Sequence, residues 1–469
     1  MKNRVMKAIS LALVVLMSAS LLAGCGGNNN SDGEASAPSA DEETEAPAAD
    51  AAADEEAETP AESAPAGEGG ELVFWNIGTD EHDTAFYNRA IENFNTTTET
   101  GYQVTSVPIQ NDIYKERIVV GMSSGETPDM YINWSGGPMN EYIEAGHAQP
   151  ITDLFNASEL PDRIMEAAVA QASYKGDIYA VPFHNVALSG FYYNKEMFDG
   201  LGLSEPTTLA ELEAICETLK ENGITPFALA NGPKWTGSMY FMNLAARKGG
   251  LEPFQAAVEG TGTFEDESFI YAGNKIIEWA EKGYFPEGVN SLSEDDGQSR
   301  QLLYQEAAGM TLIGSWYTGV LKNESEEFYS KMGWFKFPAI EDGHDDSSIM
   351  IGTIGDNFIS FSATGERLAA AFECATRFSD PDQVDFMVEL GKIPPVKGVE
   401  GKITDPINQE IIGAAGAASS TQLWYDQYLP PAVAQVHLDT SQELFGRTIT
   451  SEEAATRFQE AMQKHIEEN

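Results

Sequence analysis

The chain has 469 residues, with 74 Asp and Glu against 27 Lys and Arg, which gives a formal net charge of −47 at pH 7. Acidity of this size argues against a nucleic-acid partner, because basic patches carry that affinity. It also argues against an anionic ligand held by general electrostatic attraction, and a neutral ligand fits more easily. The chain is too long for a single hydrophobic core, so we expect two lobes.

The first 25 residues predict an export signal that ends in a lipid anchor. Basic residues at positions 2, 4 and 7 precede an apolar run over 8–22, which ends in Leu22-Ala23-Gly24-Cys25. A basic start, a short apolar stretch and small residues before a cleavage point describe a signal peptide, and the run is shorter than the roughly 20 residues that a spanning helix needs. Leu-Ala-Gly-Cys resembles the bacterial lipobox, so residues 1–24 are interpreted as the signal peptide and Cys25 as the lipidated residue. The alternative is an ordinary signal peptide with a chance cysteine.

Residues 25–70 have the composition of a disordered tether. After Cys25 they contain many Asp and Glu, neither Lys nor Arg, and otherwise mostly Ala, Pro, Ser, Gly and Asn. Such a segment buries too little apolar surface to offset its ordering entropy, and like charges extend it. We expect it to hold the folded part away from the membrane. An acidic tail that binds a ligand is the alternative.

From Glu71 onward the hydrophobic pattern alternates between strand and helix. Short apolar runs predict strands, and apolar residues at helical spacing, such as Phe86, Ala90, Ile91 and Phe94, predict helices. This alternation predicts parallel sheets covered by helices, in two α/β lobes. Strands are expected over 72–75, 102–108, 130–132, 188–193, 226–230, 310–313 and 357–361, and helices over 86–94, 113–122, 269–280 and 368–378.

Two capping patterns and two cysteines give local predictions. Thr208-Leu209-Ala210-Glu211 is a capping box that starts a helix, and Thr450 caps a last helix with Phe458, Met462 and Ile466 on its inner face. Cys216 lies on the apolar stripe of the helix after Thr208, so it is expected to be a small buried hydrophobe. A disulfide between Cys216 and Cys374 is permitted outside the cell, but the sequence does not establish it.

Several stretches resemble one known family in their order and spacing. They include Glu71–Ile77, Gly125-Glu126-Thr127-Pro128-Asp129, Tyr179–Phe183, Phe191–Phe198, the turn Gly314-Ser315-Trp316, and Gly446–Thr450 followed by Glu452 and Glu453. In that order they are similar to the extracellular solute-binding proteins (family 1, sugar-binding lipoproteins) of ATP-driven ABC sugar importers.

The resemblance implies a periplasmic-binding-protein-like α/β fold, in which two lobes joined by several hinge crossings close over a sugar. It places crossings near Val186 and Gly352. The lobes are then expected over 71–186 plus 352–395 and over 187–351 plus 396–469.

Candidate ligand-binding residues are aromatic, amide and acidic side chains that follow predicted strands, because ligands of open α/β sheets lie beyond the carboxyl ends of the strands. The apolar face of a pyranose packs on Trp and Tyr, and its hydroxyls need side chains that donate and accept hydrogen bonds. A core position for Trp75, a structural His184 and a hinge role for Asp356 and Asn357 remain alternatives, while Trp279 and Trp334 are expected to be structural. The candidates are Trp75, Asn76, Asn133, Trp134, His184, Trp235, Trp316, Tyr317, Asp356, Asn357, Trp424 and Asp426.

The resemblance implies capture of a carbohydrate, with an oligosaccharide favoured by the number of stacking candidates, and its delivery to an ABC permease. It implies no catalysis and no cofactor, and a monomer on the outer face of the membrane, where a long tether after a lipobox suits a Gram-positive cell. A receptor for a peptide or another small solute is the runner-up, and a secreted glycoside hydrolase is the alternative of another class. Gly121–Gly125 matches Gly-x-Ser-x-Gly, but it closes a helical pattern instead of following a strand. The six His residues are too scattered for a metal site, and 342–346 is expected to be a solvated loop, not a calcium site.

Overall fold

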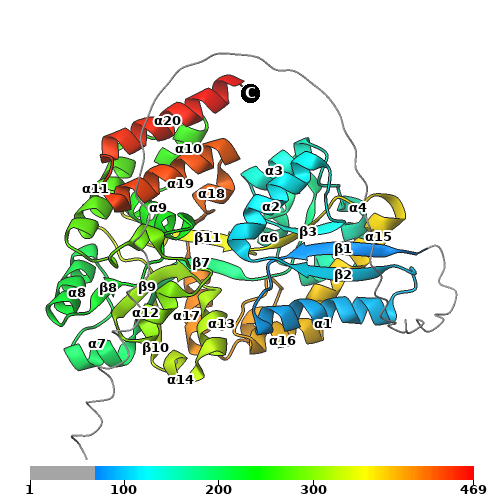
Figure 1. Ribbon diagram of the computed structural model, residues 1–469, viewed down its shortest axis with the longest axis horizontal. Helices are drawn as coiled ribbons and strands as arrows, with labels where there is room; N and C mark the ends of the chain where they lie inside the picture. The colour runs from blue at the N-terminus through cyan, green and yellow to red at the C-terminus, as the bar shows by residue number, and fades with distance from the viewer. Residues whose placement is uncertain (1–68, 469) are drawn as a thin grey trace, which may run out of the picture. The chain divides into compact units, whose positions relative to one another are not determined.

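Two mixed β-sheets organise residues 69–468, the part of the chain that the computed structural model describes (Figure 1). We call the elements around them the first and the second lobe. The predicted signal peptide, the lipidation site Cys25 and the tether up to residue 68 lie outside the described residues. Within 69–468, no helix combines the length and the apolar character that crossing a membrane requires.

The first lobe is built on a five-stranded sheet with the strand order β2-β1-β3-β12-β6. β1 is parallel to β2 and β3, whereas β12 is antiparallel to β3 and β6. The strands are β1 (Glu71–Asn76), β2 (Gln103–Pro108), β3 (Met130–Asn133), β6 (Ala180–Pro182) and β12 (Phe358–Phe361), with a separate hairpin of β4 (Ser173–Tyr174) and β5 (Asp177–Ile178).

The second lobe is built on a sheet with the order β13-β11-β7-β9-β8, and β10 also pairs with β7. Its central strand β7 (Val186–Asn194) is buried at all nine positions and is antiparallel to β9, β10 and β11. The other strands are β8 (Thr225–Phe227), β9 (Ala308–Gly314), β10 (Met332–Phe335), β11 (Met350–Ile354) and β13 (Thr421–Gln422).

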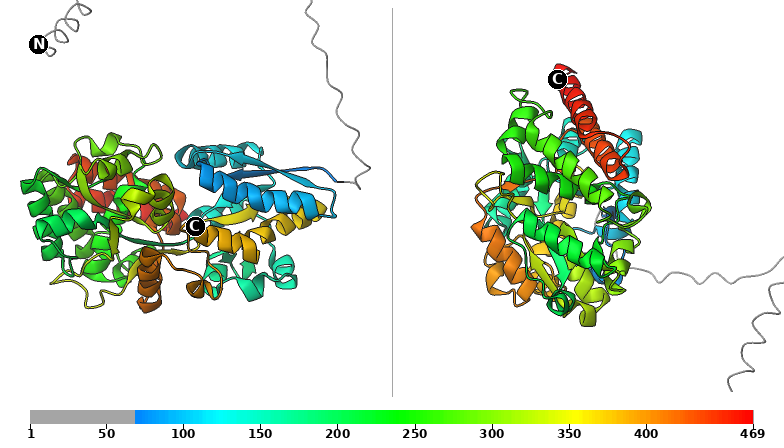
Figure 2. Two further views of the ribbon diagram at one scale, coloured as in Figure 1. Left: turned by 90° about the horizontal axis from the view of Figure 1, so that it is seen from below. Right: turned by 90° about the vertical axis from the view of Figure 1, so that its left-hand side faces the viewer.

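Helices surround both sheets, and in Figure 2 the last helix, α20 (red), packs on helices of the second lobe. In the first lobe they are α1 (Glu81–Thr97), α2 (Asn111–Ser124), α3 (Gly137–Glu144), α4 (Thr152–Ala157), α5 (Leu160–Arg163), α6 (Glu166–Gln171), α15 (Gly365–Thr376) and α16 (Pro381–Glu389). In the second lobe they are α7 (Lys195–Leu201), α8 (Leu209–Glu221), α9 (Trp235–Gly249), α10 (Glu252–Val258), α11 (Glu267–Glu281), α12 (Gln298–Tyr304), α13 (Tyr317–Glu324), α14 (Glu326–Tyr329), α17 (Pro406–Ala417), α18 (Tyr425–Tyr428), α19 (Pro431–Gly446) and α20 (Ser451–Glu468). Short 3₁₀ turns lie at Val289–Ser291, Arg377–Ser379 and Val399–Gly401.

Most of the predicted elements are confirmed, including two whose cause is local. Thr208 accepts a hydrogen bond from the backbone N–H of Glu211, and the Glu211 carboxylate accepts the backbone N–H of Thr208, so the predicted capping box starts α8. Trp279 is buried with its indole N–H 2.9 Å from Glu213 Oε1, and Trp334 is buried in β10, as expected for structural tryptophans.

Two structural predictions are wrong. The sheets are mixed, not parallel, because the chain enters β7 and β12 from the other lobe and therefore runs against its neighbours. Ile466, placed on the inner face of the last helix, is 37% exposed, although Phe458 and Met462 are buried as predicted.

The open questions about the cysteines and the Gly-x-Ser-x-Gly motif are also answered. Cys216 on α8 and Cys374 on α15 are both buried and free, so they form no disulfide. The motif over 121–125 ends α2, and Gly125 closes the helix in a left-handed conformation with φ 78°. Since a nucleophile elbow needs a strand before the serine, this is a helix end and not a catalytic turn.

The chain passes between the two sheets at three places. The crossings are the segments between β6 and β7, between β11 and β12, and between α16 and α17. The lobe boundaries expected from the family resemblance remain predictions.

The capping box gives a stability prediction for α8. Thr208→Ala removes the side-chain acceptor of the Glu211 N–H, so the free energy of unfolding should fall by about 1 kcal/mol. The measurement is urea unfolding followed by circular dichroism. The matched control is Thr218→Ala in the interior of the same helix, where alanine has the higher helix propensity and the same substitution should not destabilise. Equal losses in both variants would contradict the capping explanation.

Candidate ligand-binding site

Two adjoining cavities lie between elements of the two lobes. The first, of about 450 Å³, is here called the tryptophan cavity, and it is lined from the starts of α1 and α2 on one side and from α9, α13 and α18 on the other. The second, the adjoining cavity, has about 820 Å³. Both volumes fall within the range of small-molecule sites. The cavities share the lining residues Lys115, Trp134, Trp235, Asp426 and Gln427.

Four tryptophans from separate segments line the first cavity. Trp134 follows β3 and Trp316 follows β9, while Trp235 begins α9 and Trp424 immediately precedes α18. The ring centre of Trp316 is 6.0 Å from those of both Trp235 and Trp424. Three of the four positions come soon after the end of a strand, as expected for a site at the carboxyl edge of a sheet.

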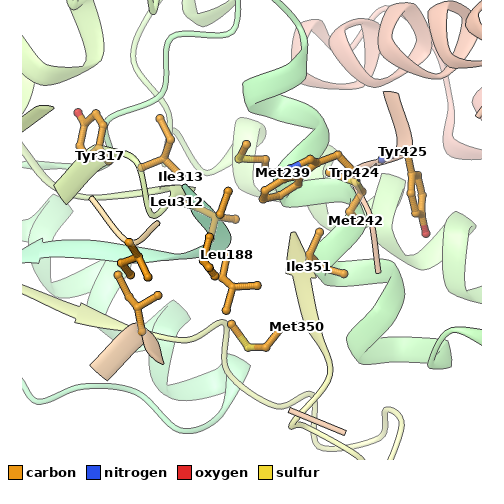
Figure 3. Close-up of a cluster of buried hydrophobic side chains, with 14 of the residues drawn as sticks. Leu188, Met239, Met242, Leu312, Ile313, Tyr317, Met350, Ile351, Trp424 and Tyr425 are labelled. Carbon is orange, nitrogen blue, oxygen red and sulfur yellow. Dashed lines mark hydrogen bonds between the residues drawn. The ribbon is translucent and has the colours of Figure 1, made fainter. Parts of the chain in front are cut away.

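An apolar layer supports the aromatic wall of the second lobe. Figure 3 shows Trp424 beside Met239 and Met242 of α9, and all three residues line the tryptophan cavity. Trp424 is 3% exposed, and the backbone N–H of Tyr425 lies 3.1 Å from the sulfur of Met242. This packing holds the Trp424 ring in one orientation without a polar anchor.

Lys115 of α2 lies between tryptophans of the two lobes. Its Nζ is 5.3 Å from the centre of the Trp134 ring and 5.5 Å from that of the Trp235 ring. Both distances are in the range of cation–π attraction, which is strongest for tryptophan. Nearby, the Trp235 indole N–H lies 3.4 Å from Asp112 Oδ1, and Asp295 Oδ2 accepts the backbone N–H of Asp112 at 2.9 Å. Side chains therefore bridge the lobes at the cavity.

A chain of polar groups, three of them buried and the fourth, Asp83, partly exposed, links the three crossings. His184 Nδ1 lies 2.7 Å from Asp356 Oδ1, and His184 Nε2 lies 3.0 Å from the ammonium of Lys392. That ammonium also lies 2.7 Å from Asp83 Oδ1, at the start of α1. Since an ammonium only donates, Nε2 of His184 must accept, so the ring proton is assigned to Nδ1 and is donated to Asp356. All four residues of this chain, here called the hinge relay, line the tryptophan cavity.

Backbone groups reinforce the hinge relay. The Asn185 N–H donates to Asp356 Oδ1 at 2.9 Å, and Asn185 Oδ1 accepts the N–H of Ile393 at 2.6 Å. The N–H of Asp356 donates to Asn185 O at 2.8 Å, and that of Val186 donates to Ile393 O at 2.7 Å. Each crossing is therefore bonded to another by main-chain and side-chain groups at once.

Carboxylates in the cavity wall differ in how they are stabilised. Burial works to raise the pKa of Asp83, but the ammonium of Lys392, together with His184 and Asp80, holds that pKa below its usual value. Burial raises the pKa of Glu294 to about 7, although Ser299 and Arg300 donate to its carboxylate. Asp426 also has a raised pKa because of burial, opposed in part by Lys115.

Ten of the twelve residues expected to bind ligand line one of the two cavities. Asn133 lines only the adjoining cavity; nine line the tryptophan cavity, namely Trp134, His184, Trp235, Trp316, Tyr317, Asp356, Asn357, Trp424 and Asp426. Trp75 and Asn76 line neither cavity. The guanidinium of Arg117 lies 4.4 Å over the Trp75 ring, and the Asn76 amide donates to Ser106 and accepts the N–H of Gly78. Ligand contact by any of the twelve stays a prediction.

Sequence reasoning missed the charged members of the wall, above all Lys115, Asp295 and Lys392. Lys115 belongs to the helix that follows β2, so the strand-end rule applied to β2 would have pointed near it. Asp295 stands in an acidic loop, and Lys392 precedes Ile-Pro-Pro. Neither has a sequence pattern that indicates a cleft, because their position depends on how the lobes meet.

The fold and the site together define a class: two α/β lobes joined by three crossings around an aromatic cavity are those of a solute-binding protein. Residues 78–378 match the family described as bacterial extracellular solute-binding protein, and the chain belongs to that family. The expected fold class and binding role are thus confirmed, and membership of this family makes the chain a binding protein, not an enzyme. Among the described residues, no group of three or more His, Cys, Asp or Glu is arranged to hold a metal ion.

Known proteins resemble most of the chain. An uncharacterized ABC transporter extracellular-binding protein of Pyrococcus horikoshii is 26% identical over 350 residues, which cover 74% of this chain and 76% of that protein. A multiple sugar-binding protein of Streptococcus mutans is 27% identical over 282 residues, which cover 57% of this chain and 61% of that protein. A structure solved in work on xylan utilization by the thermophilic bacterium Caldanaerobius polysaccharolyticus has a TM-score of 0.77 and 27% identity, covering 83% of this chain and 99% of that one.

The hinge relay gives a prediction with a pH dependence. Lys392→Met removes the cation between Asp83 and His184, and loss of one partner of a buried pair should lower the unfolding free energy by about 3 kcal/mol at pH 7. Without the cation, burial raises the folded-state pKa of Asp83 above its unfolded value. Protonation then favours the folded variant, so the deficit relative to wild type should shrink as the pH falls from 7 towards 4.

The measurement is urea unfolding of wild type and variant at both pH values. The matched control is Lys397→Met, which removes an exposed lysine five residues further along and should change stability by less than about 0.5 kcal/mol at either pH. A deficit that is independent of pH would contradict the assignment of Lys392 as the counter-ion of Asp83.

Proposed function

We propose that the protein captures a carbohydrate, most readily an oligosaccharide, outside the cell and delivers it to the permease of an ABC importer. The observation that carries this proposal is the set of four tryptophans around one cavity, with acidic, amide and imidazole groups in the same wall. Tryptophan faces pack on the apolar face of a pyranose, and the polar groups hold its hydroxyls.

The size of the site supports a ligand of more than one sugar ring. The two cavities meet at Lys115, Trp134 and Trp235, so a chain bound beside Trp424 and Trp316 has a continuation past Trp235. The sugar-binding relative from Streptococcus mutans and the structural relative from work on xylan utilization support the carbohydrate class. The relative from Pyrococcus horikoshii supports the ABC transporter partnership.

Binding works as a population shift in this proposal. The ligand contacts tryptophans of both lobes, so it stabilises the closed arrangement more than an open one. The hinge relay joins the three segments about which the lobes would move, and its residues face the same cavity. The chain supplies recognition and closure, while ATP hydrolysis belongs to other subunits of the importer.

The proposal includes a membrane anchor. Cleavage before Cys25 and attachment of two acyl chains would hold the protein on the outer face of the membrane, with residues 26–70 as the tether, in a Gram-positive cell. The lipobox-like Leu22-Ala23-Gly24-Cys25 supports the anchor. The proposed working form is a monomer, because both lobes and the whole cavity come from one chain.

The sugar proposal is tested by a thermal-shift screen of the full-length chain against neutral oligosaccharides, monosaccharides and peptides, followed by calorimetry. At a hundredfold excess over Kd, a ligand of the native state adds about 2.7 kcal/mol of stability. Trp235→Ala should weaken binding of the sugar found by at least about tenfold, which is about 1.4 kcal/mol. Trp75→Ala removes a tryptophan that lines neither cavity and should leave the affinity unchanged. A shift with peptides alone would overturn the carbohydrate proposal and favour the runner-up receptor.

The anchor is tested separately in the producing cell. Cys25→Ser removes the thiol that would be acylated, so the protein should move from the membrane fraction to the medium, measured by immunoblotting of both. Cys216→Ser changes a buried cysteine of the second lobe and should leave the protein in the membrane fraction. Membrane retention of the Cys25→Ser protein would contradict the lipid anchor.

A further inference from the structure

Among the carboxylates of the tryptophan cavity that are not exposed, Asp426 has neither an ion pair nor a hydrogen bond with another described residue. Four of the eight acidic residues of the cavity wall have a partner side chain: Glu294 and Glu324 pair with Arg300, Asp83 pairs with Lys392, and Asp356 accepts a hydrogen bond from His184 Nδ1. Asp80 and Glu81 are exposed and Asp295 accepts one backbone N–H, which leaves Asp426 of α18 without a partner of either kind. Its carboxylate makes neither a hydrogen bond nor an ion pair with another residue of the described chain, and it lines both cavities.

Lys115 is the cation that acts on the pKa of Asp426, but it forms no ion pair with the Asp426 carboxylate. Lys115 opposes the burial that raises the pKa of Asp426, but its ammonium is held over the rings of Trp134 and Trp235 and forms no ion pair among residues 69–468. Asp295 on the same cavity accepts only the backbone N–H of Asp112. Burial raises the pKa of Asp295 as well. Asp295 and Asp426 therefore both line the tryptophan cavity, and Lys115 is the cation whose charge lowers the pKa of each.

An independent observation indicates that a donor is missing. Asn357 lies at the crossing between β11 and β12, is 3% exposed and lines the same cavity. Its Oδ1 has no hydrogen-bond partner in the described structure. A buried acceptor without a donor is destabilising, so a solute that donates a hydrogen bond to Asn357 would remove that penalty.

The aromatic wall suits a cation as well as a sugar. Tryptophan faces attract positive charge, and the position of Lys115 between two of them shows that this wall already holds an ammonium. The chain as a whole is strongly acidic, with a net charge of −47, which favours the approach of cations. A neutral hydroxyl satisfies an acceptor but leaves the charge of Asp426 uncompensated, whereas an ammonium satisfies both.

We propose, building on the carbohydrate function above, that the solute is an amino sugar or an oligosaccharide that contains one, with its protonated amine opposite Asp426. The ring stacks on the tryptophans, and the ammonium takes the place of the absent counter-ion. Charge-assisted hydrogen bonds are about twice as strong as neutral ones, so the amine should be distinguished from the hydroxyl that it replaces.

Calorimetry on the full-length chain with matched ligand sets tests the proposal. One set is the β-1,4-linked glucosamine dimer, its N-acetylated form and cellobiose, which differ only in the substituent at the second ring carbon. The monosaccharide pairs of glucosamine with glucose and galactosamine with galactose extend the test. In at least one set the amine should bind about tenfold more tightly than its neutral counterpart, which is about 1.4 kcal/mol.

Asp426→Asn keeps the shape of the side chain and removes its charge, so it should abolish this preference while binding of neutral members remains. Asp345→Asn, in an exposed loop that lines neither cavity, is the matched control and should keep the preference. The wild-type comparison between ligands stands even if a variant folds poorly.

Two results would overturn the amine proposal while leaving the carbohydrate function intact. One is a neutral sugar that binds as tightly as every amine tested, and the other is a preference for amines that survives Asp426→Asn. Ethanolamine binding as tightly as an amino sugar would show a plain cation site and also overturn it. Absence of binding by any sugar, amine or neutral, would instead overturn the proposed function itself.

Discussion

The arrangement of the two lobes depends on the contacts of the buried Lys392 ammonium with Asp83 and His184. The ammonium lies between Asp83, at the start of α1, and Nε2 of His184. Nδ1 of His184 in turn donates a hydrogen bond to Asp356. These four residues come from α1 and from all three crossings. A buried charge is tolerated only when it is paired, so the three segments are held in one mutual position by the need to satisfy that charge.

The hinge relay and the ligand site share a surface. His184, Asp356 and Lys392 line the same cavity as the four tryptophans, so a solute that contacts this wall also contacts the segments about which the lobes would turn. The opposite end of the site is bridged by weaker contacts, those of Lys115 with two tryptophan rings and of Asp112 with Asp295. Strong bonds at the crossings and weak bonds across the cavity suit a protein that opens and closes without losing its hinge.

The wall of the tryptophan cavity combines an apolar aromatic surface with acidic side chains. The tryptophans and the methionines behind Trp424 give a rigid apolar surface, whereas three of the acidic residues, Asp83, Glu294 and Glu324, pair with cations of the protein. Asp426 and the amide oxygen of Asn357 have no partner among the described residues, so their hydrogen-bond donors would have to come from the solute. Selectivity in such a site comes from matching these groups, because an unpaired buried acceptor penalises a solute that lacks the donor.

The sequence by itself determined the family resemblance, most of the strands and helices, the capping box at Thr208 and the burial of Trp279 and Cys216, because these depend on local periodicity and composition. It also selected Trp134, Trp235, Trp316 and Trp424, since residues after strands gather at one edge of a sheet. Only the tertiary structure decided that Trp75 and Asn76 line neither cavity, that the sheets are mixed, and that Lys115, Asp295 and Lys392 belong to the wall. These features arise where segments far apart in the chain meet at the crossings, and the charge pairing that holds them there leaves no periodic signal in the sequence.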